Sequence, residues 1–394
     1  MERSPMETAA ADAVRAAVAD GSVTSAAWLV AVGGEVRAGA AGHIDGDPDR
    51  PASTDTIFRI SSMTKPVTAV AALQLVDDGV LALDDPIDGL LPELADRRVL
   101  RDPHGPLDDT VPAERPITLR DLLTFRMGLG MDFAASGPQP SLARLAELGL
   151  PPGPPQPQRT PPADEWLAIV GAVPLEHQPG ARWLYHLSAD VLGVLIERAT
   201  GRTLDEQVAE RIGAPLGLAD TGFSVPDDAA DRFGACFGNR RADGTREVFD
   251  AADGQWRGQP VFCSGGAGLV STVGDFHRFA AMLLRGGTTE DGRRVLSAAL
   301  LYEMTRNQLT PEQAATGGPA PGDAGWGFGV GIQLRDVPIR AAGSYDWDGG
   351  LGSTWANDPG NQMVGILLTD QAWEAPVPPP VTDAFWAAVY RSLP

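Results

Sequence analysis

The chain has 394 residues, of which 43% are hydrophobic and 21% charged, with 46 glycines and 34 prolines. This length and composition indicate a globular protein with two lobes or one large elaborated domain, and they exclude a disordered or fibrous chain. The formal net charge of −21 repels phosphate backbones and anionic membranes, which argues against nucleic-acid and membrane partners.

Local patterns predict helices at both ends of the chain and through its middle. Residues 8–20 carry apolar side chains at helical spacing, and residues 66–78 have the pattern of a buried helix closed by Gly79. Further helices are predicted over 118–125, 188–200, 203–212, 272–284 and 382–391, with capping boxes at Thr118/Asp121 and Thr203/Glu206.

Strands are predicted near both ends. An apolar run over 26–32 meets a Gly-Gly turn and returns as 35–41, which is typical of a β-hairpin. Short strands are also predicted over 327–334, 339–344, 352–356 and 363–368. This order favours an α+β fold, in which an antiparallel sheet is flanked by the N- and C-terminal helices and a mainly helical second lobe stands beside it.

We place the sheet lobe at 1–75 and 260–394 and the helical lobe at 76–259, with the active site between the two lobes. Residues 136–162 of the helical lobe contain nine prolines, which forbid regular structure over most of the segment. We interpret this segment as a stiff surface loop that is either a lid or an insertion without function.

Features that report on location favour a cytoplasmic protein. Cys236 and Cys263 are too few for a disulfide framework, so free thiols are the simpler interpretation, although one bridge stays open. The first twenty residues lack the apolar core of a signal peptide, and no apolar run reaches the ~18 residues of a membrane span.

Several catalytic signatures are missing. The sequence has no G-x-S-x-G motif, no G-x-G-x-x-G opening a helix and no Walker-type loop. Its five histidines lack metal-binding spacing, so no metal and no cofactor is expected; they are His43, His104, His177, His186 and His277.

The 31 basic residues are 30 arginines and one lysine, Lys65. Unlike a guanidinium, a desolvated amine can lose its proton and act as a base. Ser62 lies three residues upstream, which puts both side chains on one side of the first helical turn, and chance would place a Ser there roughly 4% of the time. Ser61, four residues from the lysine, is the rival nucleophile on geometry alone.

Residues 58–66, Phe-Arg-Ile-Ser-Ser-Met-Thr-Lys-Pro, resemble the nucleophile motif of the serine β-lactamase and penicillin-binding protein superfamily, most closely its class C-like branch and the family VIII carboxylesterases. Other segments resemble family motifs in the same order; they are Leu83–Pro86, Ile117–Thr124, Ala189–Gly193, Gly265–Thr272 and Trp347–Gly349. The resemblance runs from near residue 20 to near residue 390 and implies that Ser62 is the nucleophile.

The family's second motif begins with a tyrosine, which Tyr185 matches. The resemblance implies that Lys65 and Tyr185 share a proton, with the cation lowering the pKa of the phenol, and that one of them accepts the Ser62 proton. The sequence does not decide which residue is the base.

Two departures from the lactam-binding enzymes concern the substrate. Leu187 stands where class C enzymes have the asparagine that holds a substrate amide, and Trp347-Asp348-Gly349 replaces Lys-Thr-Gly, whose cation receives a carboxylate. An indole does not bind a carboxylate as an ammonium does, and an aspartate in the cleft would repel one. We therefore expect a neutral ester near Trp347, Asp348, Gly349 and Leu187.

The glycines after Trp347 suit an edge strand whose backbone approaches the acyl group, so the amides of Ser62 and Gly350 are the expected oxyanion hole. The resulting expectation is a serine hydrolase that cleaves carboxylic esters with small or medium acyl groups through an acyl-enzyme on Ser62. The alternatives are an acyltransferase, a D-amino acid peptidase or amidase, or a peptide cyclase with the same acyl-enzyme, each with weak β-lactam hydrolysis as a side activity. A catalytically idle binding relative is disfavoured by the intact Ser62, Lys65 and Tyr185. The oligomeric state is open.

Overall fold

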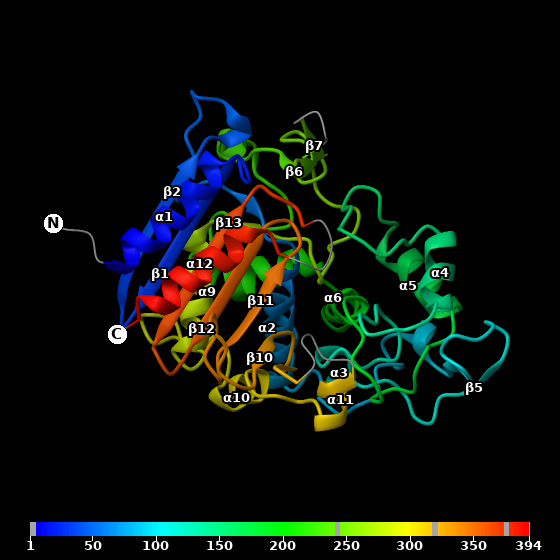
Figure 1. Ribbon diagram of the computed structural model, residues 1–394. Helices are drawn as coiled ribbons and strands as arrows, with labels where there is room; N and C mark the ends of the chain where they lie inside the picture. Colours follow the sequence, from blue (N-terminus) through cyan, green and yellow to red (C-terminus); the bar gives the residue numbers. More distant parts are fainter. Residues whose placement is uncertain (1–4, 241–244, 317–321, 374–377, 394) are drawn as a thin grey trace.

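The computed structural model describes residues 5–240, 245–316, 322–373 and 378–393 (Figure 1). Within these ranges, seven strands form an antiparallel sheet in the order β2-β1-β13-β12-β11-β10-β9. They are β1 (Ser25–Val32), β2 (Glu35–Gly42), β9 (Ala324–Trp326), β10 (Gly331–Gln333), β11 (Tyr345–Gly349), β12 (Ser353–Asp358) and β13 (Met363–Thr369). Strands from the two ends of the chain thus pair in one sheet, which confirms the α+β prediction.

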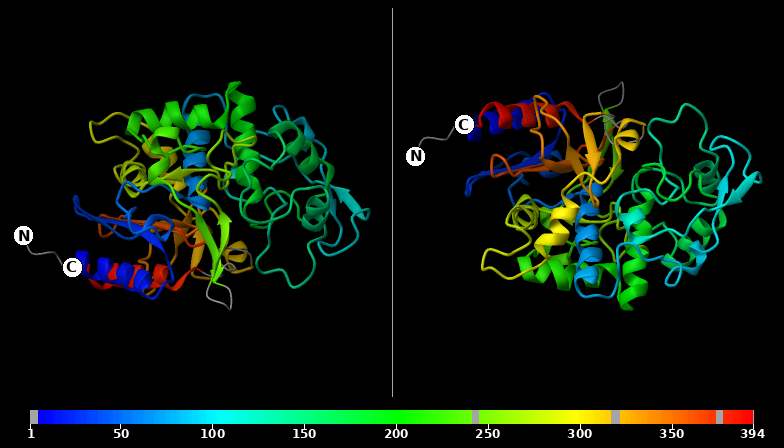
Figure 2. Two further views of the ribbon diagram at one scale, coloured as in Figure 1. Left: turned by 90° about the horizontal axis from the view of Figure 1, so that it is seen from above. Right: turned by 90° about the horizontal axis from the view of Figure 1, so that it is seen from below.

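Helices cover both faces of this sheet. The helices α1 (Pro5–Ala19) and α12 (Pro380–Arg391) lie side by side on one face, and α9 (Val273–Leu284) packs on the other, where α2 (Thr64–Asp77) also lies (Figures 1 and 2). In β1, Trp28 packs toward the terminal helices, whereas its neighbour Leu29 packs toward the main core. Because alternate side chains of a strand point to opposite faces, a strand covered on both sides is apolar throughout.

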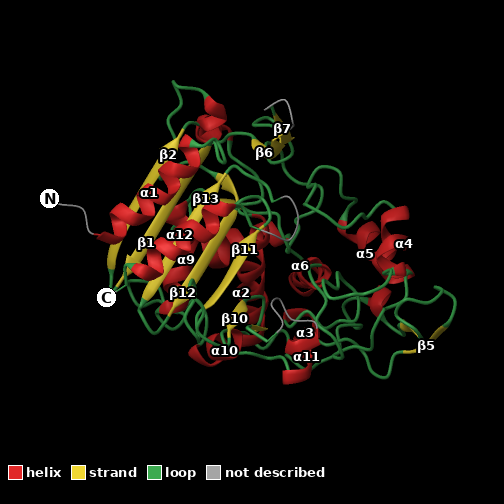
Figure 3. Cartoon of the chain, viewed as in Figure 1, coloured by secondary structure: helices red, strands yellow, loops and turns green. Residues whose placement is uncertain are grey.

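The other helices lie largely beside the sheet, within a region of helices and loops (Figure 3). They are α3 (Leu119–Leu123), α4 (Pro140–Glu147), α5 (Ala163–Ala172), α6 (Leu187–Thr200), α7 (Leu204–Val208), α8 (Ala214–Leu216), α10 (Ala298–Met304) and α11 (Pro311–Thr316). Three short antiparallel pairs complete the described structure: β3 (Phe58–Arg59) with β8 (Val270–Ser271), β4 (Arg98–Leu100) with β5 (Thr110–Pro112), and β6 (Cys236–Arg240) with β7 (Arg246–Asp250). The lobe boundaries drawn from the sequence stay a prediction.

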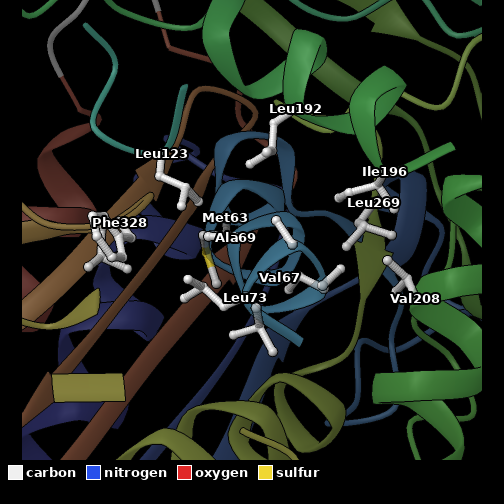
Figure 4. Packing of buried hydrophobic residues seen from close by; sticks show 14 of the residues in the cluster. Met63, Val67, Ala69, Leu73, Leu123, Leu192, Ile196, Val208, Leu269 and Phe328 are labelled. Carbon is white, nitrogen blue, oxygen red and sulfur yellow. The ribbon is translucent and has the colours of Figure 1, made fainter. Parts of the chain in front are cut away.

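The helix α2 is surrounded by other elements. Met63, Val67, Ala69 and Leu73 contribute to one large core, which also contains Leu192 of α6 and Phe328 (Figure 4). A helix that is apolar all round belongs in the interior, as the sequence pattern indicated. Burial of α2 also brings its N-terminal turn, and with it Ser62 and Lys65, into the middle of the molecule.

The locally encoded features are confirmed. The β1–β2 hairpin turns at Gly33–Gly34, and both predicted capping boxes are formed, at Thr118 and at Thr203. Cys236 and Cys263 are free thiols. Across the described residues, no helix combines the length and the apolar character needed to cross a bilayer.

The strand predictions near the C-terminal end need correction. Of the predicted strand 327–334, only Gly331–Gln333 is a strand, β10; residues 327–330 connect it to β9, which ends before the predicted range, and 339–344 is not a strand. The strand in this region is β11, which begins directly after the predicted range, at Tyr345. It is an interior strand between β10 and β12, so the predicted edge strand around Trp347 is wrong.

The proline-rich segment also contains one helix that was not predicted from the sequence. The helix α4 starts at Pro140, a position at which proline is compatible with the first turn because no N–H is needed there. The remaining prolines, Pro138 and those from 151 to 162, lie in irregular chain or immediately before α5, as predicted.

Candidate active site

Ser62 lies in a single 3₁₀ turn, Ser61–Met63, that leads directly into α2. Ser61 has φ 45°, a left-handed conformation that residues other than glycine rarely adopt. The turn is held in place by Ile60, whose N–H donates to the Leu269 carbonyl at 3.0 Å and whose carbonyl accepts from the Ser353 hydroxyl at 2.8 Å. The surrounding strands therefore maintain the strained turn that presents Ser62.

Gly349 allows the sheet to approach this turn. A Cβ at this position would overlap the carbonyl of Ile60 and the hydroxyl of Ser353. The absence of a side chain therefore lets the end of β11 pack directly against the segment that carries Ser62. The structure thus gives Gly349 a packing role that the sequence pattern did not reveal.

Lys65 is buried, and its amine has three polar neighbours. The Nζ atom lies 2.9 Å from Ser62 Oγ, 2.6 Å from the Gly266 carbonyl oxygen and 3.2 Å from His186 Nδ1. Burial lowers the pKa of the amine to about 7, and the nearby Asp190 carboxylate opposes this shift. A large fraction of Lys65 is therefore uncharged near neutral pH.

Tyr185 contacts the same hydroxyl from another side. Its phenol donates to Ser62 Oγ at 2.8 Å and accepts from the indole N–H of Trp347 at 3.0 Å. Burial raises the pKa of the phenol to about 12, outweighing the two hydrogen bonds that lower it. The expectation that the lysine cation lowers this pKa is wrong, because desolvation dominates and the amine itself is only partly charged. The structure brings Tyr185 and Lys65 to Ser62, and neither is hydrogen-bonded to Ser61 in the described structure.

His186 belongs to the site although nothing local in the sequence singles it out. Its backbone has φ 80°, and its ring lies between Lys65 and Asp190, with Nε2 3.2 Å from the Asp190 carboxylate. Asp190 also accepts from the hydroxyl of Ser264 at 2.6 Å and from the amide of Gly266 at 2.9 Å. Burial pushes the pKa of Asp190 upward, but His186 and these donors hold it below its ordinary value. A single histidine next to a tyrosine gave no local signal of this arrangement.

The other predicted contacts divide between the two faces of β11. Trp347 points toward Tyr185, whereas Asp348 lies on the opposite face, opposite Thr354 of β12 and in the field of Arg340. The alternation of a strand fixes this outcome. The expectation that Asp348 contacts a substrate is therefore wrong.

Leu187 and Gly350 have positions compatible with their predicted roles. Leu187 opens α6 and lines a cavity beside Tyr185. Gly350 lies in the turn after β11, with open space beside its α-carbon. Their functional roles stay predictions.

Comparison with known proteins agrees with this geometry. A family model described as Beta-lactamase matches residues 10–382. Protein Rv1367c of Mycobacterium tuberculosis is 39% identical over 83% of this chain and 80% of its own length. Esterase EstB of Burkholderia gladioli is 33% identical over 89% of this chain and 86% of its own length. A solved structure of simvastatin synthase from Aspergillus terreus, the LovD6 mutant, has a TM-score of 0.78 at 27% identity and covers 98% of this chain and 94% of its own.

The chain therefore belongs to the beta-lactamase family. Its architecture is the beta-lactamase-like fold, and the membership of the serine β-lactamase and penicillin-binding protein superfamily expected from the sequence is confirmed.

Proposed function

We propose that the protein is a serine hydrolase that cleaves carboxylic esters through an acyl-enzyme on Ser62. The observation that carries the proposal is the position of the Ser62 hydroxyl, 2.9 Å from a lysine amine whose pKa is about 7 and 2.8 Å from a neutral phenol. Such a hydroxyl has a base and a proton donor within hydrogen-bond distance at neutral pH.

The neighbours of Lys65 favour the amine as the base. The Gly266 carbonyl can only accept a hydrogen bond from the amine. His186 Nδ1 also accepts one when the imidazole is neutral and its Nε2–H donates a hydrogen bond to Asp190. These two acceptors take both N–H bonds of a neutral amine, and its lone pair is left for the Ser62 hydroxyl. His186 and Asp190 are therefore positioning residues for the lysine.

The phenol has the complementary role. Ser62 Oγ attacks the ester carbonyl while its proton moves to Lys65, and the tetrahedral oxyanion is held by the amides of Ser62 and Gly350. The C–O bond to the alcohol then breaks, and the departing oxygen takes a proton from Tyr185, which is replenished by Lys65. Water attacks the acyl-enzyme by the reverse proton transfers and releases the carboxylic acid.

A neutral ester suits the described site better than a carboxylate-bearing lactam. Near Ser62, the end of β11 presents the indole of Trp347, which is engaged with the phenol, and no cationic side chain of this strand faces the substrate. Similarity to esterase EstB supports ester hydrolysis. The likeness to simvastatin synthase supports a second candidate, transfer of the same acyl group to an alcohol acceptor in place of water.

Replacement of the nucleophile tests the proposal. Ser62→Ala should abolish turnover of p-nitrophenyl butyrate and prevent labelling by a fluorophosphonate, as measured by mass spectrometry. Ser61→Ala is the matched control, because it removes the neighbouring hydroxyl and keeps the turn; it should retain labelling. Full activity of Ser62→Ala would refute the assignment. A product formed with added alcohol acceptors would favour transfer.

A further inference from the structure

A cavity opens beside the candidate active site. It starts at Tyr185 and His186, extends along the proline-rich residues 149–157 and has a volume of about 220 Å³. We call it the proline-walled groove. The side chains that line it away from these prolines are mostly apolar; they include Met131, Leu142, Leu145, Leu150, Trp166 and Phe262.

The wall of the groove is fastened to the opposite side. The side-chain amide of Gln158 donates to the carbonyls of Gln255, Gly258 and Gln259 at 2.9 to 3.1 Å, and the N–H of Val261 donates to the Pro157 carbonyl at 3.0 Å. Each proline also fixes its own φ. The groove is thus held open by its own backbone. Binding of a ligand therefore loses little entropy through ordering of the chain.

The charge of the groove is low. Among the lining residues that the structure describes, the ionisable ones away from the phenol and imidazole are Arg159, which is exposed, and Asp190, which already bonds to Ser264 and Gly266. The apolar interior therefore offers no buried partner for a charged ligand. An uncharged, water-excluding group is the ligand that gains most from this surface.

We infer that the proline-walled groove binds an uncharged apolar group of the ester, such as a medium-length acyl chain or an aromatic alcohol. This inference rests on the proposed function and assigns the substrate class of the same site. The groove reaches Tyr185 and His186, whose side chains contact Ser62 and Lys65, so a ligand in it lies close to the nucleophile. Either the acyl or the alcohol part provides the same chemistry, and the assay separates the two.

Paired esters test the inference on the full chain. The kcat/KM for ethyl acetate is compared with that for ethyl decanoate, which enlarges the acyl part, and for 2-naphthylmethyl acetate, which enlarges the alcohol. Burial of about 0.8 kcal/mol per methylene predicts a rise of roughly fourfold per added carbon while the groove fills. One of the two large esters should exceed ethyl acetate at least a hundredfold. If neither does, the groove inference is overturned while the proposed function stands.

Filling the groove provides a matched pair of variants. Leu150→Trp places a larger ring in the groove and should lower the ratio of kcat/KM for the large ester to that for ethyl acetate at least tenfold. Leu148→Trp makes the same change two residues away, at a position that packs on the core but does not line the groove. It should keep the preference. Equal loss in both variants would contradict the inference.

A measurement without turnover separates the two proposals. In Ser62→Ala protein, the neutral dye N-phenyl-1-naphthylamine should bind with increased fluorescence, and adding Leu150→Trp should weaken binding at least tenfold, whereas Leu148→Trp should not. Dye binding in a protein that cleaves no ester would overturn the proposed function and retain the groove. Absence of dye binding in a protein that cleaves ethyl acetate would do the opposite.

Discussion

Trp347 donates its indole N–H to the phenol oxygen of Tyr185 at 3.0 Å, so the residue that replaces the family's lysine acts through the tyrosine. Trp347→Phe keeps an aromatic ring and removes this donor. We expect kcat to fall about tenfold, because one hydrogen bond to the phenol oxygen is lost, with little change in KM. Steady-state kinetics with p-nitrophenyl butyrate measures both parameters.

Trp326 supplies the control for this change. Its ring meets Trp347 edge-on, with centroids 4.6 Å apart, and its buried indole N–H has no hydrogen-bond partner in the described part of the chain. Trp326→Phe removes no hydrogen bond and should leave kcat within about twofold. A similar loss in the two variants would show that ring packing, and not the hydrogen bond, is what matters.

The pKa of Lys65 predicts the pH dependence. The active base is the neutral amine, so kcat/KM should rise about tenfold per pH unit below pH 7 and level off above it. Lys65→Arg keeps the charge but removes the base, and it should lower kcat at least a hundredfold. A flat profile between pH 5 and 9 would contradict the assignment of Lys65 as base.

Asp190 should set the midpoint of that profile. Its carboxylate raises the pKa of Lys65, so Asp190→Asn should move the midpoint of kcat/KM to lower pH. If Asp190→Asn only impaired folding, the rate would fall at every pH and the midpoint of the kcat/KM profile would not move. Asp253→Asn, at an exposed position, is the control and should leave the midpoint in place.

The sequence predicted those features that depend on neighbouring residues. The Gly33–Gly34 hairpin and the Thr118 and Thr203 caps are determined by a few adjacent side chains, and their local signals were sufficient. The Ser62–Lys65 pair was also within reach, because one helical turn brings the two side chains together.

The remaining features depend on tertiary contacts. His186 reaches Lys65, 121 residues away, only through a backbone with positive φ, and no periodicity encodes such a contact. The bounds of β11 and its interior place in the sheet were missed because its sequence, Tyr-Asp-Trp-Asp-Gly, alternates aromatic and charged residues, and the apolar segment before it was taken as a strand. The same alternation, read in the correct register, separates Trp347 from Asp348.

Asp348 gives a prediction about stability. One of its oxygens is buried without a hydrogen-bond partner within the described residues, and burial raises the pKa of the carboxyl to about 6. The folded protein then holds this proton more tightly than the unfolded chain, so stability falls as pH rises from about 4 through 6. Asp348→Asn should be more stable by roughly 1–3 kcal/mol at pH 7.5 and unchanged below pH 4.

Urea denaturation at the two pH values measures this effect. Asp346→Asn is the contrasting variant two residues away, since Asp346 accepts a hydrogen bond from the buried Arg340 at 2.7 Å. It should be less stable than the parent at pH 7.5, because it removes the anionic partner of a buried cation. If both variants changed stability in the same direction, the argument from the unpartnered oxygen would be wrong.

The pairing of β1 with β13 has a consequence for biosynthesis. Ser25 at the start of β1 bonds through its amide to Asp370, which lies 345 residues later in the chain. At 5–20 residues per second, the ribosome needs roughly 17–70 s to deliver that partner. Throughout this interval the apolar β1 has only β2 as a neighbour, with one edge open to other chains. We therefore expect newly made chains of this protein to depend on chaperones during translation. This dependence should be greater than in a protein whose first strand finds both of its neighbours locally.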